Sequence, residues 1–213
     1  TVSPIHNIEN YISLAKQLEA MGADSICIKD MAGLIMPQTA YELVKSIKAE
    51  VKLPIYLHSH STNGLAEMSY LKATEAGVDG IDCSISVFSS GTAQPPTETM
   101  HYALEASGFS SGLNSSLLKK INDFFKPIKE HFLQSGELDP KVLTPQPEGL
   151  VYQIPGGMLS NMISQLKAQN SIDKLEAVLE EVPRVREDLG FPPLVTPMSQ
   201  MVGTQATVNV LTG

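Results

Sequence analysis

An internal repeat is the feature that most constrains how this 213-residue chain can fold. Residues 19–27 and 75–83 each combine the end of an apolar helical pattern, a glycine, an aspartate and a short apolar run. A helix that leads through a glycine turn into a buried strand is the unit of alternating α/β folds, in which right-handed crossovers join parallel strands. The repeat therefore predicts an α/β protein with a parallel sheet.

Strands are expected at 25–30, 54–58 and 80–85, and the tail of another at 2–4. Helices are expected between them, because apolar residues recur there at helical spacing. No glycine-rich dinucleotide fingerprint and no Walker motif follows these strands, which argues against the common nucleotide-binding sheets.

The candidate site residues follow the carboxyl ends of these strands, which is where (β/α)8 barrels place their active sites. Such a barrel needs eight strands in about 250 residues, whereas the sequence predicts only four. We therefore expect the C-terminal half of a (β/α)8 TIM barrel, strands 5–8, at residues 1–108 and a mostly helical C-terminal extension at 109–213. Because an open half barrel would expose sheet edges, we expect the N-terminal half to lie outside this chain.

The extension is expected to contain one long helix through 117–132, disturbed at Pro127, because proline removes a helical hydrogen bond. Further helices are expected at about 158–169 and 172–189.

Composition narrows the classes of partner. The net charge is −8, and the 15 Lys and Arg residues form no basic cluster, which argues against nucleic acid and anionic membrane surfaces. No apolar run approaches the roughly 20 residues of a membrane span. Cys27 and Cys83 fall in predicted strands and suit reduced thiols in the core of a cytoplasmic protein.

His58 and His60 follow the apolar run 53–57, which is predicted to be a buried strand. Side chains two apart on a strand point to the same side, so both imidazoles are expected to leave the strand end together. Neutral imidazoles bind zinc and similar divalent ions. The alternative is a pair of polar side chains that only form hydrogen bonds.

Lys29 lies at the equivalent place after the preceding strand. Protonated lysine would repel a metal, but a neutral lysine that reacts with carbon dioxide becomes a carbamate, which is an anionic oxygen ligand. Burial would favour this reaction by lowering the lysine pKa. The alternative is a salt bridge with Asp30 or a neighbour, and spacing alone favours the salt bridge.

Two further segments carry candidate site residues. Ser160 follows Pro155 and paired glycines at a predicted helix start, where backbone amides attract anions; it could equally be a capping serine. The loop from Gly91 to Pro95 follows the last predicted strand and is either an active-site loop or only a connection.

Taken together, these motifs resemble those of the biotin-dependent carboxyltransferase family. That family includes oxaloacetate decarboxylase alpha chains, pyruvate carboxylase with its detached B subunit, and a transcarboxylase subunit. Residues 25–34 are similar to its lysine motif, 58–64 to its metal motif and 152–161 to its later catalytic motif. Residues 183–190 and 196–206 also match, so the resemblance covers essentially the whole chain.

The resemblance implies roles for individual residues. Lys29 would be the carboxylated lysine, His58 and His60 the histidine ligands of a divalent metal, with zinc favoured over manganese and cobalt. Ser160 stands where the family has a threonine that passes a proton to or from biotin. The family's aspartate ligand, substrate-binding arginine and glutamine, and biotin-attachment motif have no counterpart here. Biotin would therefore arrive on a separate carrier domain or subunit.

The implied function is metal-dependent carboxyl transfer between oxaloacetate or pyruvate and biotin, as in oxaloacetate decarboxylases. The implied partners are a biotin carboxyl carrier domain, a second copy in a homodimer and membrane decarboxylase subunits. The alternatives are a pyruvate carboxylase B subunit that works in the carboxylating direction, and a related metal-dependent TIM-barrel lyase or synthase. A third alternative is a non-enzymatic fragment.

Overall fold

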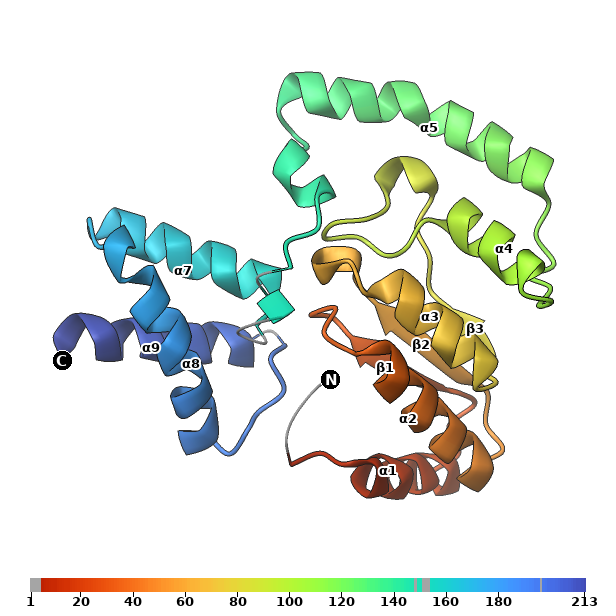
Figure 1. The fold of residues 1–213 in the computed structure, drawn as a ribbon, viewed down its shortest axis with the longest axis horizontal. Helices are drawn as coiled ribbons and strands as arrows, with labels where there is room; N and C mark the ends of the chain where they lie inside the picture. The colour runs from red at the N-terminus through yellow and green to blue at the C-terminus, as the bar shows by residue number, and fades with distance from the viewer. Residues whose placement is uncertain (1–4, 148, 151–153, 196) are drawn as a thin grey trace.

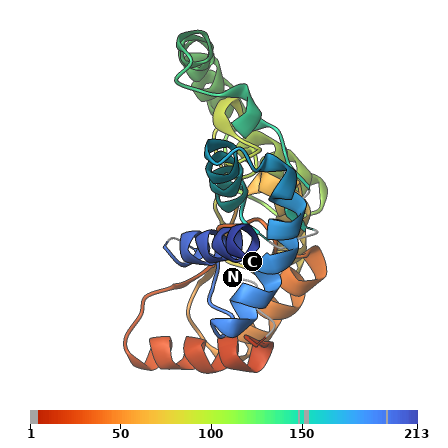
Figure 2. The ribbon, with the colours of Figure 1, turned by 90° about the vertical axis from the view of Figure 1, so that its left-hand side faces the viewer.

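A computed structural model describes residues 5–147, 149–150, 154–195 and 197–213. Figure 1 shows the small parallel sheet and its helices on one side of the molecule and the C-terminal helices on the other. Figure 2 looks from the side of the C-terminal helices and places α5 (Ser115–Ser135) and α1 (Ile8–Ala20) at opposite ends of the molecule.

The sheet consists of β1 (Ile26–Asp30), β2 (Ile55–Ser59) and β3 (Gly80–Ile81), all parallel and in that order. The first two strands confirm the expected strands to within one residue at each end. The third is much shorter than the expected 80–85, because the chain turns away after Ile81 and keeps only an isolated bridge from Ser84 to Pro96. The strand tail expected at 2–4 lies outside the described residues.

One face of the sheet is covered by α2 (Pro37–Glu50) and α3 (Ala66–Glu75), which also pack on each other. Alternate strand residues point into this layer, so Ile28 and Leu57 are buried there. The resulting core contains Ala15, Ile26, Ile28, Ile35, Ala40, Leu43, Val44, Ile47, Val51, Ile55, Leu57, Tyr70, Ala73, Met100 and Leu104. α4 (Thr97–Ala106) follows the sheet and supplies the last two of these residues.

The other face of the sheet is open. Cys27, Lys29 and Tyr56 are exposed on it, because they alternate with the buried strand residues. The expectation that Cys27 is a core thiol is therefore wrong. Cys83 lies just beyond β3 and is partly buried; burial, helped by the charge of Asp82, raises the pKa of its thiol to about 12.

The long helix α5 starts at Asn114, whose side chain accepts a hydrogen bond from the Leu117 amide, and ends at Gly136 in a left-handed conformation. It continues through Pro127, so the disturbance expected there does not end the helix. None of its described residues is fully buried. Phe125 and Phe132 contact Phe88 of the 3₁₀ turn η2 (Ser86–Phe88).

The C-terminal helices α7 (Gly156–Ala168), α8 (Leu175–Asp188) and α9 (Met198–Thr212) form a second core. The first two confirm the helices expected near 158–169 and 172–189, except that 172–174 form a 3₁₀ turn, η4 (Ile172–Lys174). A Cβ atom at Gly203 would lie 3.3 Å from Met158 and Met162, so glycine there allows α9 to approach α7 closely. No helix in the described part of the chain is long and apolar enough to cross a membrane.

Candidate metal site at the strand ends

The sheet brings the predicted site residues of β1 and β2 together. Lys29 and His58 are direct partners in the parallel register, and parallel neighbours are about 4.8 Å apart. Both side chains leave the sheet on its open face, whereas Asp30 is buried on the covered face. His60 follows one residue beyond β2 in an extended conformation (φ −99°, ψ 145°), so it continues the alternation and joins His58.

The imidazoles of His58 and His60 face each other with their Nε2 atoms. Their centroids are 5.0 Å apart, and the Nε2 atom of His58 lies 3.1 Å from Nε2 of His60. Each Nδ1 atom has its own partner: that of His58 lies 2.8 Å from an Asp82 carboxylate oxygen, and that of His60 lies 2.6 Å from the Thr92 carbonyl oxygen.

These partners determine which nitrogen of each neutral ring carries the hydrogen. A carboxylate and a carbonyl only accept hydrogen bonds, so Nδ1 carries the hydrogen in both imidazoles. In the neutral rings, each Nε2 atom then carries a lone pair and no hydrogen. The two Nε2 atoms lie 3.1 Å apart, so their lone pairs face each other. A cation between the two nitrogen atoms would stabilise such an arrangement.

The distance between the two Nε2 atoms is suitable for binding a metal ion. Two tetrahedral zinc ligands with bonds of about 2.0–2.1 Å are about 3.3 Å apart. The 3.1 Å separation of His58 Nε2 and His60 Nε2 is close to this value, so the residues present fit a divalent metal.

The loop from Gly91 to Pro95 contributes directly to this arrangement. Besides the Thr92 carbonyl, it places the Gln94 side-chain nitrogen 3.3 Å from His60 Nε2. The Ser84 hydroxyl donates to the Gln94 side-chain oxygen at 2.8 Å, which orients the amide with its nitrogen toward the imidazole. The sequence predicts that this loop lies near the site, but no local pattern points to Gln94.

A buried tyrosine holds the backbone around the site. The Tyr70 hydroxyl accepts a hydrogen bond from the Ser59 amide at 2.7 Å and donates to the Asp82 carbonyl at 2.8 Å. Burial strongly raises the pKa of this phenol, which therefore keeps its donor hydrogen. Asp30 adds a second anchor, because its carboxylate accepts hydrogen bonds from the Ser59 hydroxyl and the Ile35 amide, both at 2.9 Å.

The ligand set is incomplete within the described residues. Among them, no group of three or more His, Cys, Asp or Glu side chains could hold a metal ion.

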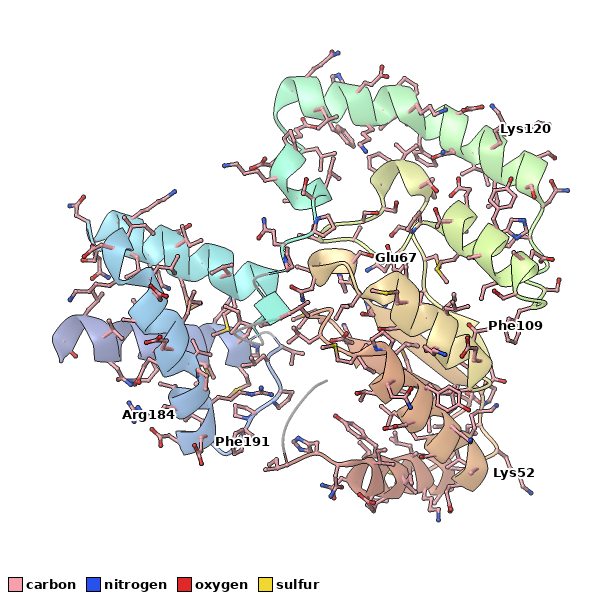
Figure 3. All side chains as sticks on the ribbon, in the orientation of Figure 1. Lys52, Glu67, Phe109, Lys120, Arg184 and Phe191 are labelled. Atoms are coloured by element: carbon pink, nitrogen blue, oxygen red, sulfur yellow. The ribbon has the colours of Figure 1, made fainter. Side chains whose placement is uncertain are left out.

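The site can be located in Figure 3 from Glu67, which is labelled there. The Glu67 carboxylate accepts a hydrogen bond at 2.9 Å from Ser61, the residue after His60, so it marks the end of the sheet where the imidazoles lie.

Ser160 lies in the second turn of α7, and its side chain is outside the described residues. The helix begins after Pro155, which occupies the N-cap position, so the alternative of a capping serine is wrong. The role of Ser160 stays a prediction.

Comparisons with known proteins show the family of this chain. Residues 4–125 match the HMGL-like family, and residues 150–213 match the conserved carboxylase domain. The chain belongs to the HMGL-like family. The expected resemblance to biotin-dependent carboxyltransferases is thereby confirmed.

Individual relatives cover the chain from end to end. It is 56% identical to the B subunit of pyruvate carboxylase from Methanocaldococcus jannaschii, over 100% of this chain and 37% of that protein. It is 50% identical to the methylmalonyl-CoA carboxyltransferase 5S subunit of Propionibacterium freudenreichii subsp. shermanii, over 100% of this chain and 42% of that protein.

Among solved structures, the carboxyl transferase domain of Rhizobium etli pyruvate carboxylase with pyruvate and biocytin superposes with a TM-score of 0.85. It is 29% identical, and the match covers 98% of this chain and 35% of that one. The chain thus spans less than half the length of the relatives that it matches.

Proposed function

We propose that the protein containing this chain transfers a carboxyl group between biotin and pyruvate or oxaloacetate at a metal site built on His58 and His60. The observation that carries the proposal is that the Nε2 atoms of His58 and His60 lie 3.1 Å apart. In each ring, a hydrogen-bond acceptor at Nδ1 leaves the Nε2 lone pair directed at the other ring. The relatives' names support the chemistry, and those named as B subunits of pyruvate carboxylase favour pyruvate as the acceptor.

Lys29 would be the third ligand among the described residues. Its register with His58 on the open face supports a ligand role for its carbamate, which forms when the neutral amine adds to carbon dioxide and loses a proton. A further ligand would come from outside the described residues. Zinc is the first candidate, with manganese and cobalt as alternatives, and the ion would supply Lewis-acid polarisation of the 2-keto oxygen.

The other proposed roles belong to the second half of the chain and to its partners. Ser160 would hold and pass a proton at the biotin ureido nitrogen through its hydroxyl. Biotin would be brought by a carrier domain or subunit, which is the partner that the family implies.

We also propose that residues 1–108 form the second half of a TIM barrel and that 109–213 form its helical extension. Three parallel strands, helices on one face and an open opposite face support this division. The two separate cores support it as well. The open face would be the inner wall of the barrel once the first half is supplied.

The test is to assay the intact protein for oxaloacetate decarboxylation with and without free biotin, and to measure bound metal. Lys29→Ala should abolish biotin-dependent transfer and reduce metal content, because it removes an anionic ligand. Lys52→Ala is the matched control, since Lys52 is an exposed lysine at the other end of the sheet (Figure 3). Full activity in Lys29→Ala would refute the assignment, and activity without any biotin dependence would favour a lyase or synthase.

A further inference from the structure

Asp82 contacts a predicted metal ligand, although its position in the sequence assigned it no role. We propose that Asp82 is a positioning residue that holds the His58 imidazole in the form in which Nε2 can bind a metal. The inference rests on the proposed function, because it concerns the same site.

The backbone places Asp82 beside His58. Ile81 is the register partner of Leu57, so Asp82 follows at the level of His58 in the neighbouring strand. Its amide donates to the Leu57 carbonyl at 3.1 Å, and its carbonyl accepts from the Tyr70 hydroxyl at 2.8 Å. The carboxylate is therefore attached to backbone that is held on both sides.

Gly80 leaves room for the Tyr56 ring where β3 pairs with β2. A Cβ atom at Gly80 would lie 2.5 Å from ring atoms of Tyr56, which is closer than side chains can approach. With glycine at this position, β3 pairs closely with β2, and Asp82, two residues later, reaches His58.

In this contact, a carboxylate forms a hydrogen bond with the ring nitrogen of a histidine that does not face the metal. Asp82 accepts the hydrogen on Nδ1 at 2.8 Å, which favours the tautomer whose Nε2 lone pair can bind a metal. Without this acceptor, His58 could place its hydrogen on Nε2, where it would block the metal. His60 is held in the same way by the Thr92 carbonyl, but no side-chain substitution removes a backbone group.

The solvent exposure of the Asp82 and His58 side chains allows a positioning role to be distinguished from a structural one. The Asp82 side chain is 51% exposed and that of His58 is 20% exposed. Ion pairs this accessible to water add little to folding stability. Loss of Asp82 should therefore change metal affinity and leave the unfolding midpoint nearly unchanged.

The test measures binding of zinc alone to the metal-free intact protein, by competition with a chelating dye, alongside thermal unfolding. Zinc is a suitable probe because imidazole nitrogen is one of its usual protein ligands. Asp82→Ala should weaken zinc binding by about 10–100-fold. Asp82→Asn keeps an acceptor oxygen without the charge and should restore part of the affinity.

Asp24→Ala is the matched control, because Asp24 is an exposed carboxylate in the turn at the opposite end of β1. His58→Ala reports on the site itself. If His58→Ala weakens zinc binding but Asp82→Ala binds zinc within twofold of the unsubstituted protein, the role of Asp82 is refuted and the proposed function stands. If His58→Ala also binds normally, both are refuted. A fall in the unfolding midpoint of Asp82→Ala, with no recovery of affinity in Asp82→Asn, would make Asp82 a structural residue and refute its positioning role.

Discussion

The two faces of the three-stranded sheet differ in what their side chains do. On the covered face, Ile28 and Leu57 pack under α2 and α3 and make the core. On the open face, Lys29 and His58 stand side by side at the strand ends. Because strand residues alternate, the same short strands supply both the packing that holds the fold and the groups available for chemistry. Substitutions on the two faces should therefore have separable effects.

The largest effect is expected from the open face. His58→Ala removes one of the two converging imidazoles, so we expect loss of bound metal and a fall in carboxyl transfer of about 10³-fold or more, since a metal ion supplies several kcal/mol of transition-state stabilisation. Metal analysis and initial rates on the intact protein measure it. Because the His58 side chain is only 20% exposed, urea unfolding should be run in parallel; a variant that lost stability but kept its metal would break the comparison.

The covered face should show the opposite pattern. Leu57 is completely buried, so Leu57→Ala should lower the free energy of unfolding by about 2–5 kcal/mol through lost contacts and a cavity. Urea denaturation gives this value, and zinc affinity should be unchanged under conditions in which the variant is folded. Met21→Ala is the control, since Met21 is 82% exposed and its removal should cost less than about 0.5 kcal/mol.

Tyr70 connects the two faces and should affect both measurements. Tyr70→Phe keeps the buried ring but leaves the Ser59 amide and the Asp82 carbonyl without their hydrogen bonds to the phenol. We expect a loss of about 1–3 kcal/mol in the free energy of unfolding, together with weaker zinc binding because both groups lie next to the site. Unchanged zinc affinity would show that the hydroxyl stabilises the fold alone.

The smallest effect is expected at the amino-terminal end of the sheet. Burial raises the pKa of Asp79, but hydrogen bonds from Lys48 and from the Ile55 amide, both 2.7 Å, outweigh it, so the net pKa is lowered. A lowered folded-state pKa contributes stability above the unfolded pKa, and this stability is lost as the pH falls through the folded pKa. Asp79→Asn should flatten the acid side of the stability–pH profile by about 1 kcal/mol or less and leave zinc binding unchanged.

Much of the sheet could be predicted from local patterns. The apolar runs before Lys29 and His58 gave the first two strands to within a residue, and strand alternation gave the pairing of His58 with His60 on one side. The third strand was predicted too long, because a run of apolar residues does not show where the chain leaves the sheet. The apolar neighbours of Cys27 predict a core position for it, yet strand alternation places it on the open face, where it is exposed.

Asp82, Thr92 and Gln94 were missed for a different reason. They act through contacts with residues 24–34 positions away, and no local pattern specifies such contacts. One signal was present for Asp82: the second copy of the repeat has this carboxylate between Ile81 and Cys83, where the first copy has none between Ile26 and Cys27.

By itself, the sequence determined the alternating α/β pattern, the strand that carries His58 and His60, and the family to which these motifs belong. These follow from periodicity and residue type, which act over a few neighbouring positions. Only the tertiary structure decided which face of the sheet is covered, and that both imidazoles present Nε2 to one point. That geometry depends on an Asp82 carboxylate and a Thr92 carbonyl brought in from other segments, and a hydrogen bond between distant segments exists only once the chain has folded.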